Sequence, residues 1–189
     1  AKPDAVVIAT GVTRYAPDLP GIKSNRVVEA IDVLTGRVKV GDNVVVIGGG
    51  VVGSETAEFL ADKGKQVTIA RRSQFMANKM NPDMRMLLVD RLRNKGVTML
   101  TGVQYQQATD TGMRVHVRGG ITSMAEIAAD AMKNFPADTF VLAAGSVPNT
   151  ALKEAIEKTG VKVKCIGDCV EPRTILEAIK EGWLAAAEI

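Results

Sequence analysis

The stretch "VVVIGGGVVGSE", residues 44–55, decides the fold, because it leads from an apolar strand through a run of glycines into a helix. Its G-x-G-x-x-G spacing is met by Gly48, Gly50 and Gly53. In such a turn the first glycine permits the tight bend, the second lets a pyrophosphate approach bare backbone, and the third lets the helix pack closely on the sheet. The helix N-terminus adds unpaired N–H groups and a partial positive charge. The spacing therefore predicts a dinucleotide site, with a merely structural turn as the alternative.

The residues after the glycines complete a βαβ unit. Ala57, Leu60 and Ala61 recur at helical spacing, and Gly64 marks the expected end of the helix. Residues 65–70 then supply the next strand. Strand, glycine turn, helix and strand follow one another as in a right-handed crossover, which makes dinucleotide binding the favoured interpretation of the glycines.

A second crossover follows, and then the pattern changes. Asn81, followed by proline, predicts the N-cap of another helix, and residues 97–100 form the strand expected after it. Alternating polarity over residues 105–109 and 113–117 predicts antiparallel strands. Residues 121–135 fit either a helix or a further strand. The expected fold is α/β: a Rossmann-like three-layer domain with a parallel sheet and a small antiparallel meander.

Weaker patterns lie toward both ends of the chain. Residues 6–9 are expected to form a strand buried on both faces, and residues 24–35 a weak helix. Residues 162–166 predict another strand, followed by a helix from about Arg173. Each of these helices carries its apolar residues on one face: Val28, Ile31 and Leu34 in the first, and Ile175, Ile179, Trp183, Ala186 and Ile189 in the second.

Two arginines follow the second strand of the βαβ unit, in "VTIARR" at residues 67–72. An acidic side chain at this place bonds the adenosine ribose hydroxyl of NADH, but it would repel the 2′-phosphate of NADPH. Arg71 and Arg72 reverse that preference, since a guanidinium pairs with phosphate oxygens and stays charged. We therefore expect NADPH to be preferred over NADH. The alternative is that Arg72 only solvates the loop.

The composition excludes several classes of function. The chain has 189 residues, 46% of them hydrophobic, and its net charge of +3 comes from 24 basic and 21 acidic residues without a long block of either sign. Such a chain lacks the basic arm of a nucleic-acid binder and the apolar run of about 20 residues that a membrane helix needs. Cys165 and Cys169 lie four residues apart, which fits packing better than a zinc site or a Cys-x-x-Cys redox pair. We expect a cytoplasmic protein with no nucleic-acid or membrane partner and no metal ligands.

Two further stretches bear on domain organisation. "DAVVIATG" at residues 4–11 resembles "DTFVLAAG" at residues 138–145, as if everything between them were an insertion entered and left through matching turns. Any two buried strands can look alike, which is the alternative. In "IGDC", Asp168 follows a strand and can bond hydroxyls of a flavin side chain, although it can equally act as a helix cap. The abrupt start and end of the chain suggest an excised piece.

The ordered motifs "VVIATG", "VVVIGGGVVGSE", "VLAAGSVPN" and "IGDCVEPRTILEAI" resemble the two-dinucleotide-binding flavoproteins of the glutathione reductase superfamily. The tail is most similar to NADH:flavin oxidoreductases of the 2,4-dienoyl-CoA reductase, 2-enoate reductase and trimethylamine dehydrogenase type. This resemblance implies an NAD(P)H-binding Rossmann-like domain at residues 41–147, inserted into a partial FAD-binding domain at residues 1–40 and 148–189. It also implies hydride transfer from NAD(P)H to FAD for eventual reduction of an enoyl or enoate substrate.

The resemblance also implies where the cofactors lie. Arg71 would lie near the adenosine ribose, Asp168 would contact the FAD ribityl chain, and Gly11 and Gly145 would lie close to the flavin side of the crossings. The nicotinamide dinucleotide site would be lined by Gly48, Gly49, Gly50, Val51, Val52, Gly53 and Glu55, with Arg72 beside it.

Two parts of the family pattern are missing from this sequence. The first G-x-G-x-x-G, which cradles the FAD pyrophosphate, is absent, and so is the barrel that holds FMN and a cysteine-held iron–sulfur cluster. No Cys-x-x-Cys dithiol replaces them. We therefore expect an NAD(P)H-binding fragment whose FAD and FMN domains belong to a longer chain, and which is inactive alone. A stand-alone nucleotide-binding or sensing module is the alternative. A dithiol reductase of the thioredoxin reductase type is disfavoured.

Overall fold

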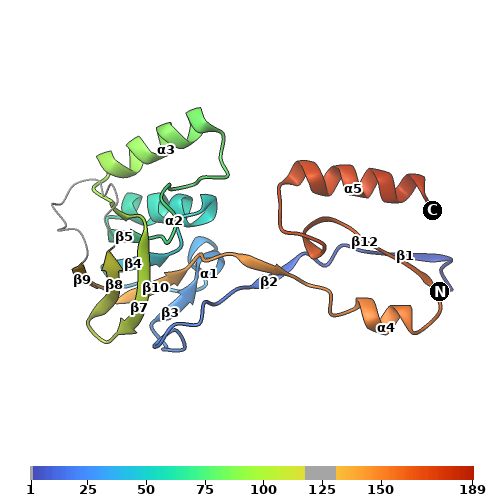
Figure 1. Cartoon of the computed structure of the whole chain (residues 1–189), viewed down its shortest axis with the longest axis horizontal. Helices are drawn as coiled ribbons and strands as arrows, with labels where there is room; N and C mark the ends of the chain where they lie inside the picture. Colours follow the sequence, from blue (N-terminus) through green and yellow to red (C-terminus); the bar gives the residue numbers. More distant parts are fainter. Residues whose placement is uncertain (1, 118–130) are drawn as a thin grey trace. The chain divides into compact units, whose positions relative to one another are not determined.

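The computed structural model describes residues 2–117 and 131–189, and the chain forms two compact units (Figure 1). Unit 1 contains the residues up to Tyr15 together with Gly145–Ile189, and unit 2 is Ala16–Ala144. The boundary expected after residue 40 lies inside unit 2. The reason is that β3 (Val27–Glu29) pairs with β10 (Thr139–Leu142) at the edge of the main sheet of unit 2.

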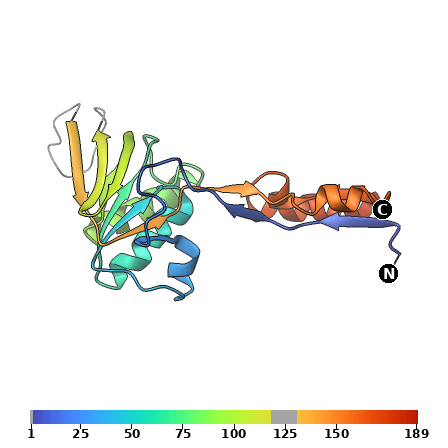
Figure 2. The ribbon, with the colours of Figure 1, turned by 90° about the horizontal axis from the view of Figure 1, so that it is seen from below.

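Unit 2 is built on a five-stranded parallel sheet with the strand order β3-β10-β4-β5-β6 (Figures 1 and 2). Its remaining strands are β4 (Asn43–Ile47), β5 (Gln66–Ala70) and β6 (Thr98–Leu100), which confirms the three strands expected from the crossovers. Val46 of β4 lies between Val141 of β10 and Ile69 of β5. Because the strands are parallel, the carboxyl ends of β4, β5 and β10 lie along one edge of the sheet, where ligands of such folds bind.

Two apolar cores lie on opposite faces of this sheet and make the three expected layers. Val44 and Val46 of β4 pack into a core with the helices, and Val45 and Ile47 pack into a core with the antiparallel meander. All four are 0–1% exposed. The helices of the first core are α1 (Ala30–Leu34), α2 (Val51–Asp62) and α3 (Pro82–Asn94). Side chains of a strand alternate between faces, so a continuous apolar run is what a central strand covered on both sides requires.

The long helices begin and end where the sequence predicts. The side-chain oxygen of Asn81 accepts a hydrogen bond from the N–H of Asp83 at 3.0 Å and so caps α3. Helix α2 buries Ala57 and Leu60, and Gly64 follows its end with φ +76°. The longest described helices, α3 and α5 (Ile175–Ala187), have 13 residues each, and none in the described part of the chain has the length and apolar character to cross a membrane.

The helix expected over residues 24–35 is wrong for most of its length. Val28 lies in β3, and α1 begins only at Ala30. The residues of α1 that face the core are Ala30 and Val33, whereas Ile31 is 50% exposed and Leu34 is 37% exposed. Pairing with β10 draws the β-branched pair at positions 27 and 28 into the sheet, because backbone hydrogen bonds to a neighbouring strand outweigh a weak local helix preference.

The predicted meander is confirmed. It consists of β7 (Val103–Thr109), β8 (Gly112–Val117) and β9 (Ala131–Pro136), joined in antiparallel order. Residues 131–135 of the ambiguous segment therefore lie in the strand β9, while the rest of that segment lies outside the described residues. Met113, Val115 and Val117 of β8 are buried against the main sheet.

Unit 1 contains two small sheets. β1 (Ala5–Ile8) pairs in parallel with β12 (Lys162–Cys165), and β2 (Val12–Arg14) pairs antiparallel with β11 (Ser146–Pro148). Its other elements are α4 (Lys153–Glu157), a 3₁₀ turn η1 (Gly167–Cys169) and α5. The expectation that the first strand is buried on both faces is wrong, since Ile8 is buried but Val7 is 42% exposed.

The apolar stripe predicted on the last helix exists, but it is exposed. Ile175, Ile179 and Trp183 of α5 are 64–78% exposed, and of this helix only Ala185 is buried. A two-stranded sheet and a 3₁₀ turn offer little surface against which a helix of 13 residues can pack. Unit 1 therefore has much less apolar core than unit 2.

Candidate functional site

The glycine-rich turn between β4 and α2 is shaped by close backbone contacts. Gly48 has φ +108°, and a Cβ on it would lie 2.4 Å from the carbonyl oxygen of Ala143. A Cβ on Gly53 would lie 1.9 Å from the carbonyl oxygen of Gly48. Real Cβ atoms do not come so close to backbone, so both positions require glycine. These are the two conformational roles that the spacing predicts for the first and third glycines.

The two central glycines differ from each other. A Cβ on Gly49 would lie 2.4 Å from the sulfur of Met76, so this glycine lies under a neighbouring side chain. Gly50 has an ordinary φ of −69°, and the nearest atom to a Cβ built on it is Nη1 of Arg71, at 3.8 Å. Gly50 is the N-cap of α2, and no side chain caps this helix. The N-terminus of α2 therefore keeps donors that an external acceptor can use.

A loop after β5 folds against the glycine-rich turn. The N–H of Ala77 donates to the carbonyl oxygen of Gly49 at 2.8 Å, and Met76 and Ala77 are buried. Ala77 has φ +45°, which is uncommon for a residue with a side chain. This contact occupies the carbonyl oxygen of Gly49 and so ties the loop to the backbone of the turn.

Arg71 lies beside the turn and is only partly paired. Its Nη2 donates to the side-chain oxygen of Asn78 at 2.6 Å, while its Nε is buried without a hydrogen-bond partner. Burial lowers the pKa of the Arg71 guanidinium, because a cation loses hydration there, although an arginine still remains charged. A desolvated cation next to the positive end of a helix is an unfavourable combination unless an anion lies between them.

Arg72 is held in a different way. Its guanidinium carbon lies 5.7 Å from the centroid of the Tyr105 ring, and its side chain is exposed. The hydroxyl of Tyr105 donates to the carbonyl oxygen of Ala70 at 2.7 Å. The same carbonyl accepts the N–H of Gly48 at 2.9 Å. Burial raises the pKa of Tyr105 to about 12, against the opposing effect of the two neighbouring guanidiniums, so this tyrosine is neutral at physiological pH.

The remaining predicted residues of unit 2 lie on the first turns of α2. Val51 is half-buried, Val52 is 55% exposed and Glu55 is exposed. The structure thus brings Gly49 and Gly50 close to Arg71 and holds Arg72 against the ring of Tyr105. Sequence reasoning missed Asn78 and Tyr105, because neither belongs to a spacing motif. The only signal for Tyr105 was a large aromatic residue at the start of the meander.

Gly11 and Gly145 lie at the two crossings of unit 1. Both have positive φ, +66° and +123°, and a Cβ on either would meet nothing within 4 Å. The carbonyl oxygen of Gly11 accepts the N–H of Asn149 at 2.9 Å, and that of Gly145 accepts the N–H of Tyr15 at 3.3 Å. The two glycines therefore lead into the paired strands β2 and β11 in matching ways.

Asp168 lies in the 3₁₀ turn that follows β12. Its Oδ1 accepts the N–H of Arg173 at 3.1 Å, and the N–H of the neighbouring Gly167 donates to Oε2 of Glu181 at 2.6 Å. Arg173 is also paired with Glu181, and this contact raises the pKa of Arg173 and lowers that of Glu181. These contacts of the turn lie within unit 1, and the N-cap of α5 is Thr174 rather than Asp168.

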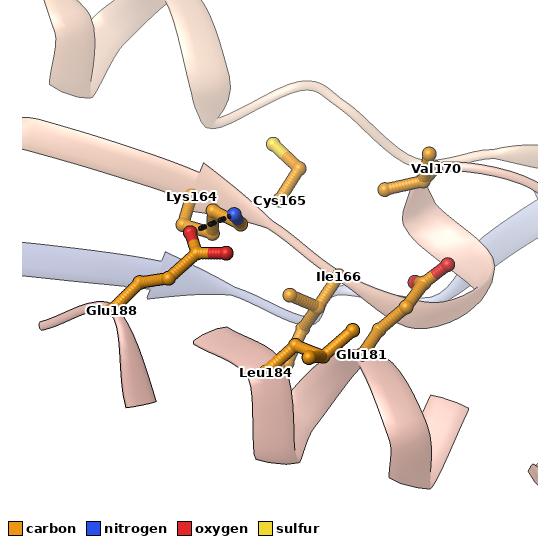
Figure 3. A pocket seen from close by; sticks show the side chains of 7 residues that line it. All are labelled: Lys164, Cys165, Ile166, Val170, Glu181, Leu184 and Glu188. Carbon is orange, nitrogen blue, oxygen red and sulfur yellow. Dashed lines mark hydrogen bonds and ion pairs between the residues drawn. The ribbon is translucent and has the colours of Figure 1, made fainter. Parts of the chain in front are cut away.

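A shallow pocket lies between the end of β12 and α5 (Figure 3). It encloses about 240 Å³, and Lys164 and Glu188 form an ion pair at its rim. Cys165 is half-buried in the pocket wall, whereas Cys169 is buried, with its thiol 3.1 Å from the carbonyl oxygen of Ile8. Neither cysteine forms a disulfide. The pocket is lined by Lys164, Cys165, Ile166, Val170, Glu181, Leu184 and Glu188.

The residues of the glycine-rich turn fit a diphosphate. The helix start is uncapped, a Cβ on Gly50 would meet no atom closer than 3.8 Å, and the buried Nε of Arg71 is unpaired. All three features suit the same partner, a compact anion with several acceptor oxygens. No second G-x-G-x-x-G spacing occurs in the sequence.

Comparison with known proteins agrees with this geometry. The family model of the pyridine nucleotide-disulphide oxidoreductases matches residues 1–170. The chain is 35% identical over 186 residues to a bilirubin reductase of Mediterraneibacter gnavus and 33% identical over 194 residues to an NADH oxidase of Thermoanaerobacter brockii. These matches take in 98% and 100% of the chain, but only 27% and 28% of the two relatives.

Among solved structures, a 2-naphthoyl-CoA reductase in complex with 2-naphthoyl-CoA superimposes with a TM-score of 0.87 and 31% identity, over 99% of this chain and 27% of that protein. A histamine dehydrogenase from a Rhizobium species superimposes with a TM-score of 0.81 at 20% identity, over 98% of this chain and 30% of that protein, which supports the fold alone. Since the family model covers most of its length, the chain belongs to the pyridine nucleotide-disulphide oxidoreductase family.

Proposed function

We propose that unit 2 binds NAD(P)H through the glycine-rich turn and serves as the pyridine-nucleotide domain of a longer flavin-dependent oxidoreductase. The observation that carries the proposal is the uncapped start of α2 at Gly50, with the guanidinium of Arg71 beside it. The backbone N–H groups there would bind the diphosphate, and Arg71 would neutralise part of its charge.

In this proposal unit 1 contributes the smaller part of an FAD site. Gly11 and Gly145 would allow the flavin to approach the crossings, and Asp168 would bond the ribityl chain. When both are bound, NAD(P)H supplies a hydride that FAD accepts. The residues of this chain would bind and orient the nucleotide; none of them transfers a proton or forms a covalent bond in the proposed step.

The proposal extends to the longer protein. The chain spans less than a third of the length of the relatives named above, and one of the most similar structures is a 2-naphthoyl-CoA reductase. Similarity to that enzyme supports a parent protein of the enoate or enoyl-CoA reductase type, with an FMN domain that carries an iron–sulfur cluster and reduces an unsaturated acyl substrate. We further propose NADPH as the preferred donor, because two arginines follow β5 where NADH enzymes carry a carboxylate.

The test is the substitution Gly50→Asp. Gly50 has an ordinary φ and no close neighbour, so an aspartate fits there and can cap α2, which should raise stability by a few tenths of a kcal/mol. The same carboxylate would repel the diphosphate. We expect the affinity for NADPH, measured from the fluorescence of its dihydronicotinamide, to fall by about 100-fold or more, since a charge repelled within a partly buried site costs several kcal/mol.

Gly182→Asp is the charge-matched control. Gly182 lies in α5, has no left-handed φ, and a Cβ on it would meet no atom closer than 3.8 Å. This variant should bind NADPH like the parent chain. If Gly50→Asp retained full affinity while remaining folded, the diphosphate would not lie at the start of α2 and the proposed function would be wrong.

A further inference from the structure

We propose that Tyr105 is a positioning residue for nucleotide specificity: its ring holds Arg72 where the cation distinguishes NADPH from NADH, and its hydroxyl holds the strand end that carries the glycine-rich turn. The inference rests on the proposed function, and it adds a residue from the antiparallel meander to a site otherwise built from the βαβ unit.

The hydroxyl of Tyr105 acts on the backbone of the turn. It donates to the carbonyl oxygen of Ala70, the last residue of β5, at 2.7 Å, and that oxygen also accepts the N–H of Gly48 at 2.9 Å. The carbonyl thus joins three elements: the meander, β5 and the turn after β4. Loss of the hydroxyl removes one of the two donors at this junction and should loosen the turn for any nucleotide.

The ring of Tyr105 acts on Arg72. The guanidinium carbon lies 5.7 Å from the ring centroid, within the range of a cation–π contact. Arg72 is otherwise exposed, and a long exposed side chain has many rotamers to lose when it binds a phosphate. A ring that already supports the guanidinium reduces this entropic cost, so it strengthens only those interactions that Arg72 itself makes.

In this proposal the two arginines therefore bind different groups of the nucleotide. Arg71 is bonded to Asn78 and lies next to Gly50, the place of the diphosphate that NADH and NADPH share. Arg72 is one residue further along the chain, and its guanidinium rests on the ring of Tyr105. Arg72 can distinguish the two nucleotides only through a group that differs between them, and that group is the 2′-phosphate of NADPH. Substitutions at Arg71 should lower both affinities, and substitutions at Arg72 should lower one.

The experiment measures the dissociation constants (Kd) of NADH and NADPH for the full chain and follows their ratio. Tyr105→Leu removes ring and hydroxyl, and we expect the ratio Kd(NADH)/Kd(NADPH) to fall by about two- to fivefold, the worth of an exposed cation–π contact. Tyr105→Phe keeps the ring, so both affinities should fall together and the ratio should stay unchanged. Tyr15→Leu, which changes the other tyrosine of the chain, is the control and should alter neither quantity.

Arg72→Gln provides a double-mutant cycle. It should remove the preference for NADPH, and adding Tyr105→Leu to it should cause no further change in the ratio, because the ring would then have no cation to hold. If circular dichroism shows that Tyr105→Leu is unfolded, Arg72→Lys tests the same contact without a change in the core. Lysine keeps the charge but not the planar guanidinium, so the ratio should fall, whereas a purely electrostatic role would preserve it.

The outcomes separate this inference from the proposed function. If the parent chain prefers NADPH and both Tyr105→Leu and Arg72→Lys leave the ratio unchanged, the positioning role is overturned and nucleotide binding stands. Equal affinity of the parent chain for both nucleotides also overturns the inference, because Arg72 would then read no 2′-phosphate. Binding of neither nucleotide overturns both.

Discussion

Two strands of this chain lead through a glycine with positive φ into a helical turn, but the surroundings of the two turns differ. Gly48 follows β4 with φ +108°, and Gly167 follows β12 with φ +67°. Strand β4 lies between two parallel neighbours and has side chains that are 0–1% exposed, whereas the sheet of β12 has two strands. The N–H of Gly167 is bonded to Glu181, but the start of α2 has no side-chain cap. The same local pattern leaves donors free for an external acceptor only where its own helix provides no cap.

The comparison extends to the cores of the two units. Unit 2 has two clusters of fully buried side chains on the two faces of its sheet. Unit 1 leaves Ile175, Ile179 and Trp183 of its longest helix largely exposed. Unit 2 therefore has the apolar burial that a small domain needs to fold by itself, while unit 1 has a single thin layer. Three predictions test this difference, from the largest effect to the smallest.

The largest effect is expected from truncating matched apolar residues of the two units. Leu60 of α2 is 1% exposed and Ile179 of α5 is 64% exposed. Leu60→Ala should destabilise unit 2 by about 2–5 kcal/mol, through lost burial and a cavity, whereas Ile179→Ala should change stability by less than about 0.5 kcal/mol. Hydrogen exchange of peptides from each unit, measured by mass spectrometry, follows the two separately. Comparable losses for the two substitutions would mean that α5 is packed as tightly as α2.

An intermediate effect is expected from alkaline pH through Tyr105 of unit 2. The pKa of Tyr105 is raised to about 12 in the folded protein. Because the folded protein favours the neutral tyrosine, its free energy of unfolding is unaffected below the ordinary tyrosine pKa of about 10 and falls as the pH rises toward 12. For a shift of two pKa units the loss of stability is about 2–3 kcal/mol. The parent chain should therefore lose stability between these pH values relative to Tyr105→Phe, as followed by urea denaturation. Parallel pH profiles of the two proteins would contradict the burial of this hydroxyl.

The smallest effect concerns ion pairs on the two surfaces. Glu58 of α2 accepts hydrogen bonds from Arg91 at 2.6 Å and from Lys95 at 3.0 Å, and these contacts lower its pKa to about 2. Glu58→Gln should cost up to about 1 kcal/mol at neutral pH. Because the folded pKa is lowered, the difference from the parent should be present above about pH 4.5 and vanish as the pH falls toward 2.

Glu188 of unit 1 gives the matched substitution. It pairs with Lys164, which lowers the pKa of Glu188, but its side chain is 56% exposed against 16% for Glu58. Glu188→Gln should therefore have a smaller effect than Glu58→Gln in the same urea titrations, since solvent screens an exposed pair. A larger effect for Glu188 would reverse the ranking of the two units.

The strong local patterns of unit 2 were readable from the sequence. The run of valines at residues 44–46 and the spacing of Gly48, Gly50 and Gly53 predict the strand, the turn and the helix that the structure contains, and Asn81 caps α3 as expected. Such features depend on backbone geometry and on the periodicity of neighbours along the chain, which a sequence displays directly. The pairing of β3 with β10 joins residues more than 100 positions apart, so it could not be predicted from the weak helical pattern around Val28.

The sequence by itself determined that this chain would form a glycine turn at the end of a buried parallel strand, with two arginines near it. Only the tertiary structure decided what each arginine contacts. Asn78 and Tyr105, 7 and 33 residues away from Arg71 and Arg72, hold the two guanidiniums in different places, since Arg71 bonds Asn78 and Arg72 stacks on Tyr105. The tertiary structure also leaves the apolar stripe of α5 exposed. The physical reason is that burial, stacking and charge pairing depend on which surfaces meet in space, and the periodicity of residues along the chain does not specify these tertiary contacts.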